Sequence, residues 1–337
     1  MQIEIAILRG AAALACLVEL AGCGGGGGGS PSSCIFISCP SGPIPATPPT
    51  PHAFIAPERQ SAQVGTSITF TANIENFSNP SYAWCREGAS AACVAMPEVT
   101  GGSLTLPSVN LGDDGARFRV TVTGAEGAVT TGFARLSVSP MPGVAFEDGE
   151  FLESDWSVQA IVVPAQNGPT FTAARLATGG NPGAYRTATY DMTTTQPGLA
   201  RILYSGPTYF PTSQGAILVI DFTEDCNTTS LSFGPALIPL IEQGGRRYIA
   251  SNAAAGCTVN GWSTRMESSI AREEFVLVDG PACGSGESCP DFSASAAPIR
   301  LGIAGSAELT TSLPSTGPAV AHFAHGIDNW KATVWRR

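Results

Sequence analysis

The side chains that could carry out acid–base or nucleophilic chemistry are few in this sequence and poorly arranged for it. Glycoside hydrolysis needs two facing carboxyl groups about 5 to 10 Å apart. The acids Glu147-Asp148 and Glu273-Glu274 are sequence neighbours, and neighbouring side chains of a strand point to opposite faces. Ser285 lies outside any Gly-x-Ser-x-Gly pattern, and no nucleophile can be assigned to the two candidate bases, His322 and His325. We therefore predict a protein that is not an enzyme.

A second chemistry open to this chain is sugar binding by aromatic rings, which offer an apolar face with a polar rim. Four aromatic residues in the C-terminal half are candidates for such a platform: Trp156, Tyr185, Tyr209 and Trp262. The alternative is that they belong to the hydrophobic core, where large aromatic side chains are often buried.

Ten cysteines suggest an oxidising compartment. Apart from Cys16 and Cys23, they fall into four pairs of sequence neighbours: Cys34 with Cys39, Cys85 with Cys93, Cys226 with Cys257, and Cys283 with Cys289. An even count in a secreted chain indicates disulfides, although eight cysteines allow on the order of a hundred connectivities. A zinc site would need closely spaced ligand pairs, which this sequence lacks.

Composition points to a turn-rich β protein. The chain has 337 residues, enough for two domains at about 100 to 200 residues each. It contains 39 glycines and 26 prolines, and only 13% of its residues are charged. A net charge of −10 argues against nucleic acid as a partner, because phosphates attract stripes of Lys and Arg. After residue 23 no apolar run approaches the roughly 20 residues that span a bilayer.

The N-terminus carries the most specific motif. Arg9 precedes an apolar stretch, residues 10–22, and Leu20-Ala21-Gly22-Cys23 resembles a bacterial lipobox. The resemblance implies a lipoprotein signal peptide over residues 1–22, lipidation of Cys23 and attachment to the membrane through the N-terminal lipid. Because glycine follows the cysteine, it also implies the outer membrane of a Gram-negative bacterium, on its periplasmic or exposed side. The alternative is an ordinary cleaved signal peptide.

Residues 23–56 are rich in Gly, Ser and Pro and end in a proline-dense run. Such a composition cannot bury a core, and it predicts a tether that is flexible in its glycine part and stiffer in its proline part.

Residues 57–140 contain short alternating segments separated by Gly, Asn and Asp, which predicts a β-sandwich. Trp84 and the segment 111–120 resemble the core tryptophan and the turn into strand F of an immunoglobulin-like domain. Ala72 and Val120 stand where the family has its inter-sheet disulfide, so packing around Trp84 must hold the core. The resemblance implies a spacer or adhesive module, and fold alone does not imply function.

Residues 143–337 open with Phe146-Glu147-Asp148-Gly149 and close with Gly326-Ile327-Asp328-Asn329. These anchors resemble galactose-binding-like and carbohydrate-binding jelly rolls, and residues 179–185 resemble a turn of laminin-type modules. In such jelly rolls the first and last strands are neighbours near a structural calcium. Glu147, Asp148 and Asp328 are thus candidate calcium ligands. Alternatively, Glu147 and Asp148 turn the chain while Asp328 accepts bonds from backbone amides.

Together these observations predict an all-β fold, an immunoglobulin-like β-sandwich followed by a larger jelly-roll sandwich. The predicted function is that of a non-catalytic surface lipoprotein that presents the jelly roll to a glycan or an extracellular protein. No cofactor is expected besides the candidate calcium. A secreted polysaccharide-active enzyme with a jelly-roll catalytic domain remains the alternative, because all-β sandwiches can hold active sites without a local motif.

Overall fold

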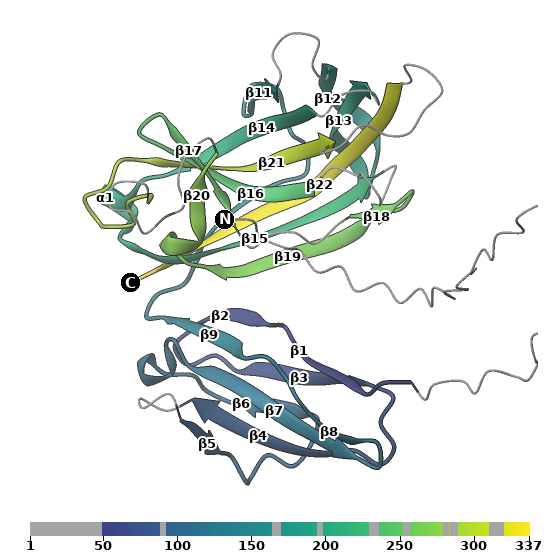
Figure 1. Cartoon of the computed structure of the whole chain (residues 1–337). Coiled ribbons are helices and arrows are strands. Elements are labelled where there is room, and N and C mark those ends of the chain that lie inside the picture. Colours follow the sequence, from purple (N-terminus) through teal and green to yellow (C-terminus); the bar gives the residue numbers. More distant parts are fainter. Residues whose placement is uncertain are drawn as a thin grey trace, which may run out of the picture. The chain divides into compact units, whose positions relative to one another are not determined.

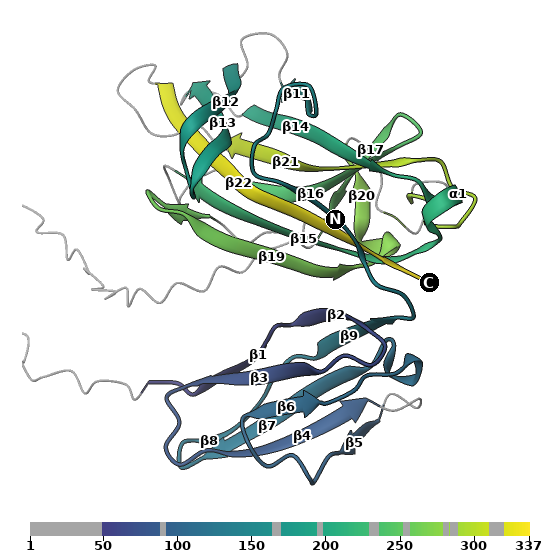
Figure 2. The same cartoon turned by 180° about the vertical axis from the view of Figure 1, so that it is seen from behind.

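The computed structural model describes residues 49–87, 92–163, 170–193, 198–228, 236–251, 257–278, 283, 289–309 and 320–337. Residues Pro49–Arg337 form one compact unit built almost entirely of β-strands in four sheets (Figures 1 and 2). The predicted signal peptide, the lipidation site Cys23, most of the tether and the Cys34–Cys39 pair lie outside the described residues and stay predictions.

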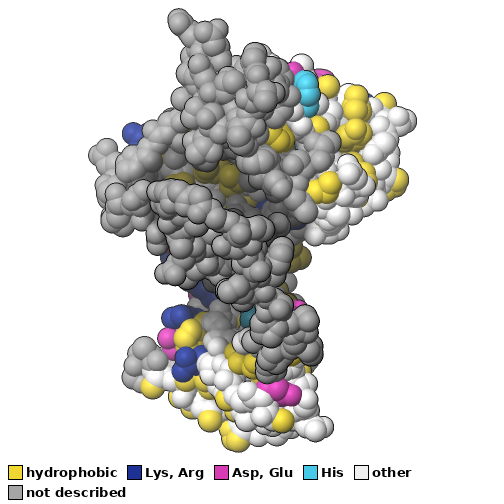
Figure 3. Space-filling model, turned by 45° about the vertical axis from the view of Figure 1, so that its right-hand side comes forward, with side chains coloured by type: hydrophobic (Ala, Val, Ile, Leu, Met, Phe, Trp, Pro, Cys, Tyr) yellow, Lys and Arg dark blue, Asp and Glu magenta, His cyan; other side chains and the backbone are white. Residues whose placement is uncertain are grey.

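The first sandwich has one sheet in the order β1-β3-β6 and another in the order β2-β9-β7-β4-β5, with β8 on β7. Its strands are β1 (His52–Ala56), β2 (Arg59–Gln63), β3 (Ile68–Glu75), β4 (Ser81–Glu87), β5 (Cys93–Ala95), β6 (Ser103–Leu106), β7 (Arg117–Gly124), β8 (Gly127–Thr130) and β9 (Ala134–Ser139), and the 3-10 helix Leu111–Asp113 precedes β7. On the face shown in Figure 3, Lys and Arg side chains gather beside hydrophobic ones on this sandwich.

The core of the first sandwich follows from strict alternation. In β3 and β7 every second side chain is buried, because successive residues of a strand point to opposite faces. Trp84 is 1% exposed, packs with Phe70 and Phe118, and donates from Nε1 to the carbonyl of Gly101 at 2.9 Å. Buried Val120, at the position of a missing family cysteine, is part of the same apolar cluster.

The sandwich begins earlier than the sequence indicated. β1 starts at His52, inside the segment 23–56 predicted to be tether, and pairs with β3. Ala53 and Ile55 alternate with exposed neighbours and are buried in the core. The surrounding prolines obscure this short alternation, so the predicted boundary at residue 57 is corrected to the start of β1.

The second sandwich has a sheet in the order β12-β13-β22-β15-β18, with β10 on β22 and β19 on β15, and a facing sheet in the order β11-β14-β21-β16-β17-β20. The strands of the first are β10 (Val144–Asp148), β12 (Thr170–Gly180), β13 (Gly183–Thr193), β15 (Ile217–Thr228), β18 (Thr258–Val259), β19 (Ser263–Ile270) and β22 (Val320–Arg336). Those of the second are β11 (Ser157–Val163), β14 (Gly198–Tyr209), β16 (Ala236–Gln243), β17 (Arg246–Ala250), β20 (Phe275–Leu277) and β21 (Ile299–Leu309). A short helix, α1 (Pro211–Gln214), and the 3-10 turn Arg272–Glu274 complete it.

Side chains from both sheets fill the space between them in a single cluster that includes Tyr204, Phe222, Ile303 and Trp330. The first and last strands are neighbours, since β10 pairs with β22 from Val144 opposite Val334 onwards. The predicted all-β class with β-sandwiches is therefore confirmed, whereas the finer assignment to the jelly-roll family stays a prediction.

Within the compact unit the two sandwiches meet at hydrogen bonds around the carboxylate of Asp221. Its Oδ1 accepts from the Ser61 hydroxyl at 2.8 Å and from the backbone N–H of Ser269 at 2.6 Å, and its Oδ2 accepts from Trp335 Nε1 at 2.7 Å. Burial raises the pKa of Asp221, and these three donors oppose the rise.

Within the ranges that the structure describes, three disulfides join cysteines that are near neighbours in the sequence: Cys85–Cys93, Cys226–Cys257 and Cys283–Cys289. Cys226 and Cys257 are buried, whereas Cys85 lies on the opposite face of β4 from Trp84 and is half-buried. Among the described residues, no helix is long and apolar enough to cross a membrane.

Candidate ligand-binding site

Two aromatic side chains meet on the outer face of the sheet that contains β22. Tyr185 lies in β13, and Trp262 lies just before β19. Their rings are 5.4 Å apart between centroids and nearly perpendicular. Trp262 Nε1 donates to the carbonyl of Gly179, near the end of β12, at 3.2 Å. Both residues are half-exposed, so a ligand can reach the rings.

A glycine on β22 allows the two rings to approach the sheet. Gly326 pairs with Thr187 of β13 and with Asn227 of β15. A Cβ atom at this position would lie 2.9 Å from Trp262 and 3.1 Å from Tyr185. The missing side chain therefore makes room for the aromatic pair, as expected for a glycine at a close approach.

A polar cluster lies beside the aromatic pair, centred on the largely buried carboxylate of Asp225. Asp225 accepts from Thr264 Oγ1 at 2.6 Å, from Asn329 Nδ2 at 2.8 Å and from Asn181 Nδ2 at 3.2 Å. The side chains of Asn181, Thr264 and Asn329 are exposed. Asn329 has a φ of 46°, a left-handed conformation that asparagine adopts more readily than most residues.

Asp328 fixes the backbone beneath this cluster. It is fully buried and accepts from the backbone N–H of Asn181 and from that of Asn329, the latter at 2.7 Å. Asn329 Nδ2 also reaches the carbonyl of Asn181 at 2.5 Å. The turn between β12 and β13 is thereby tied to the bulge of β22. The result is a pre-formed surface with apolar rings and fixed amide groups, a combination that can pack sugar C–H groups and hydrogen-bond hydroxyls.

The other two aromatic candidates are corrected to core residues. Trp156 is 4% exposed, donates to Asp148 Oδ2 at 2.6 Å and packs edge-on against Trp330 at 5.0 Å. Tyr209 is 0% exposed and donates its hydroxyl to the carbonyl of Gly215 at 2.8 Å. Their polar atoms are satisfied inside the sandwich, so a surface ligand cannot stack on these rings.

The three candidate calcium ligands are bonded to different protein groups. Asp148 Oδ1 accepts from the backbone N–H groups of Glu150 and Phe151, both at 2.8 Å. Glu147 forms an ion pair with Lys331 at 2.5 Å. Within the described part of the chain there is no group of three or more His, Cys, Asp or Glu side chains that could hold a metal ion. A calcium site here stays a prediction, and its ligands would have to leave these donors.

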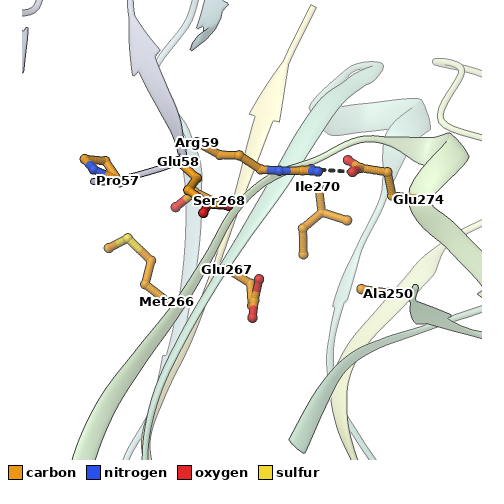
Figure 4. Close-up of a pocket in the computed structure, with 9 residues that line it drawn as sticks. All are labelled: Pro57, Glu58, Arg59, Ala250, Met266, Glu267, Ser268, Ile270 and Glu274. Carbon is orange, nitrogen blue, oxygen red and sulfur yellow. Dashed lines mark ion pairs between the residues drawn. The ribbon is translucent and has the colours of Figure 1, made fainter. Parts of the chain in front are cut away.

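A pocket of about 330 Å³ lies between the segment that follows β1 and the strands β17 and β19 (Figure 4). Three carboxylates, from Glu58, Glu267 and Glu274, line it. Arg59 extends across the pocket to Glu274, with which it forms an ion pair. Burial raises the pKa of Glu267, and the guanidinium of Arg265 at 3.4 Å opposes that rise.

Behind Glu267, ionisable groups continue into the core. Arg265 is 5% exposed, lies 3.2 Å from the carboxylate of Glu224 and donates to the carbonyl of Leu237 at 2.7 Å. Burial raises the pKa of Glu224 to about 7, although Arg265 opposes the rise.

The two histidines considered as bases are far from equivalent. His325 is 1% exposed, and burial lowers its pKa to about 3. Its Nδ1 lies 3.4 Å from the hydroxyl of Tyr190. His322 is exposed and pairs with Asp191 at 2.5 Å. Within the described residues neither has a serine or cysteine nucleophile as a hydrogen-bond partner.

Sequence reasoning identified Tyr185 and Trp262 but missed Asn181, Asp225 and Asn329. Asn181 stands in the Gly-Asn-Pro-Gly turn that the sequence analysis singled out, and Asn329 follows Asp328 directly. Both asparagines thus lie in or beside motifs that the sequence displays. Their meeting at Asp225 depends on the pairing of β15 with β22, which no local pattern reveals.

No protein-family model matches this chain, and no curated protein matches it. The solved structures it resembles include the N-terminal four Ig domains of Dscam1 isoform 4.44, at 20% identity over 27% of this chain and 21% of that chain, with a TM-score of 0.23. A marsupial T cell receptor is 9% identical over 46% of this chain and 93% of that one, also with a TM-score of 0.23. The chain thus spans about a fifth of the Dscam1 structure. At these TM-scores the similarities carry no argument about this protein.

Proposed function

We propose that this protein is a non-catalytic binding module, held at the outer membrane through a lipidated Cys23, and that the second sandwich binds a glycan. The observation that carries the proposal is the half-exposed pair Tyr185 and Trp262 beside the amides of Asn181 and Asn329. A sugar ring laid against the aromatic pair would bring its hydroxyls to the polar cluster around Asp225. In this proposal the first sandwich and the tether hold the site away from the membrane.

The test is glycan-array screening of the purified full chain, with and without calcium, followed by titration of any glycan that binds. Trp262→Ala should weaken binding at least about tenfold, because one well-placed aromatic contact commonly contributes more than 1.4 kcal/mol. Phe210→Ala is the matched control, since Phe210 is an aromatic residue that is 48% exposed elsewhere on the same sandwich. Equal binding by both variants, or no bound glycan in either condition, would count against the site.

The proposed membrane attachment is tested by a separate measurement. Mass spectrometry of the mature N-terminus should find an acylated Cys23, whereas an unmodified cysteine would make the protein secreted but not anchored.

A second candidate function is polysaccharide cleavage at the pocket of Figure 4. It is favoured by one observation, namely that Glu267 lines this pocket with a raised pKa, beside further carboxylates. A general acid needs such a pKa, and a second carboxylate would complete the pair. Turnover of a polysaccharide panel that is abolished by Glu267→Gln would favour the enzyme over the binding module.

A further inference from the structure

A row of three arginines crosses the first sandwich. Arg59 on β2 lies directly opposite Arg135 on β9, and Arg135 lies directly opposite Arg117 on β7. Residues opposite each other on paired strands share a face of the sheet, so the three side chains extend from the same side. Neighbouring strands are about 4.8 Å apart, and the row therefore spans about 10 Å. We call these three residues the arginine row.

Such a row needs an explanation in this chain. The whole sequence has only 17 Lys and Arg against 27 Asp and Glu, and like charges directly opposite each other destabilise a sheet. Arg59 pairs with Glu274, and Arg117 pairs with Glu87 at 2.9 Å. In the described part of the chain, the exposed guanidinium of Arg135 has no ion pair.

An aromatic ring holds part of the cluster in place. The guanidinium carbon of Arg117 lies 4.3 Å from the centroid of the Phe133 ring, and that of Arg119 lies 4.9 Å from it. Arg119 also forms no ion pair with a described carboxylate. Cation–π contacts of this kind restrict the guanidinium groups without neutralising their charge.

The cluster surrounds a hollow large enough for a ligand. An open pocket of about 500 Å³ is lined by Arg59, Arg117 and Arg135 together with Glu58, Gly115 and Phe133. On the face shown in Figure 3, basic side chains gather around hydrophobic ones on this sandwich. Glu58 is the one acid among the described residues of the lining, which thus has more positive than negative groups.

We propose that the arginine row binds the sulfate or carboxylate groups of an anionic polysaccharide. Guanidinium groups match planar and tetrahedral oxyanions through two parallel hydrogen bonds. A row about 10 Å long fits a chain with successive charges better than a single small anion. An anionic membrane or a nucleic acid carries a denser negative charge than such a polysaccharide. A protein with a net charge of −10 would be repelled more strongly by it. This site is separate from the aromatic pair and does not depend on the function proposed there.

The experiment titrates the full chain with dextran sulfate and with polygalacturonate in 50 mM NaCl, using neutral dextran as the uncharged probe. Both anionic polymers should bind, and binding should weaken steeply by 500 mM NaCl because exposed charges are screened. Arg135→Gln should weaken binding about tenfold, since it removes a charged donor without breaking an ion pair seen here. Arg272→Gln is the matched control, because Arg272 is an exposed arginine on the second sandwich and its contact with Glu273 is long, at 4.0 Å.

Each outcome decides the proposal. Loss of affinity in the Arg135 variant with retention in the Arg272 variant supports it, and a smaller loss in Arg119→Gln strengthens it. Equal losses in the two matched variants would show only a non-specific effect of net charge and would overturn it. Binding to phosphatidylglycerol vesicles or to RNA, with no binding to either anionic polysaccharide, would overturn it as well. Circular dichroism spectra identical to wild type establish that the variants are folded.

Discussion

The two sandwiches fill their interiors with different chemistry. The core of the first is an apolar cluster around Trp84, Phe70 and Phe118. Between the sheets of the second lie charged and titratable groups as well, among them Glu224 and Arg265. Burying an ionised group costs free energy unless it is paired and hydrogen-bonded. The comparison therefore predicts that the stability of the second sandwich depends on the protonation of its core groups, whereas that of the first depends on apolar packing and its disulfide.

The largest effect is expected from Trp84→Ala in the first sandwich. Removing a fully buried tryptophan should lower the free energy of unfolding by about 3 to 5 kcal/mol, because a cavity replaces its contacts. Denaturant unfolding followed by circular dichroism measures this loss. Val94→Ala, at a side chain that is 61% exposed in the same sandwich, should change it by less than about 0.5 kcal/mol. Similar losses in both variants would contradict the core described here.

The next largest difference between the two sandwiches is expected in the free energy of unfolding that each loses when a disulfide is removed. Cys226–Cys257 closes a sequence separation of 31 residues and Cys85–Cys93 one of 8. Loop-closure entropy predicts a loss of about 4 kcal/mol for the double serine variant of the first pair and about 2.5 kcal/mol for that of the second. Unfolding of both double variants under the same buffer conditions checks the difference. A larger loss at Cys85–Cys93 would reverse the comparison.

The dependence on pH comes third and concerns the second sandwich. Glu224 keeps its proton in the folded state up to about pH 7 but loses it near 4.5 when unfolded. Its contribution to the free energy of unfolding therefore falls as pH rises between these values. His325 has a folded pKa of about 3 against 6.5 unfolded, and its contribution is lost as pH falls from 6.5 towards 3. Between pH 4.5 and 6.5 the two opposing slopes, each about 1 kcal/mol per pH unit, should largely cancel.

Replacing one of the two residues at a time should reveal the pH dependence of the free energy of unfolding that the other contributes. Relative to wild type, Glu224→Gln should gain stability as pH rises from 4.5 to 6.5, and His325→Phe should lose it over the same range. Thermal unfolding across this range provides the measurement, and Trp84→Ala is the control whose difference from wild type should not change with pH. A flat difference for Glu224→Gln would show that its carboxyl titrates normally in the folded protein.

The smallest effect is expected at the junction of the two sandwiches. Ser61→Ala removes one of the three hydrogen bonds to Asp221 and the hydrogen bond between the Ser61 and Ser269 hydroxyls, and it should cost about 1 kcal/mol. Ser103→Ala, at an exposed position of the first sandwich, should cost less. If unfolding is unaffected by either change, the Ser61 hydrogen bond does not couple the two sandwiches.

Much of the first sandwich could be predicted because its strands alternate clearly between apolar and polar residues. The alternating runs at 67–72, 82–85, 103–106, 118–122 and 133–138 overlap β3, β4, β6, β7 and β9. In the second sandwich the apolar runs 216–222 and 274–278 overlap β15 and β20, and the opening and closing motifs overlap β10 and β22, but no such signal marks β12 or β14. β12 is built largely from Ala, Thr and Gly, and its outward residues differ little in polarity from its inward ones. A weak contrast between the faces removes the signal on which strand prediction depends.

The candidate site shows the same limit. The sequence shows that a residue is aromatic but not whether its ring is buried. Tyr185 and Trp262, which are partly exposed, therefore could not be distinguished from the buried Trp156 and Tyr209. The arginine row was even harder to foresee. Arg117 and Arg119 are two residues apart in the sequence, but the register that places Arg59 and Arg135 beside Arg117 is a property of the folded sheet.

The central position of β22 has a consequence for the time at which the second sandwich can form. This strand pairs with β10, β13 and β15, yet every other strand of its sheet precedes it in the chain. During synthesis the sheet therefore lacks its middle strand until residues 320–336 have emerged. Until then no strand links β13 to β15. A chain that stops before Val320 would retain exposed strand edges, which are prone to aggregate.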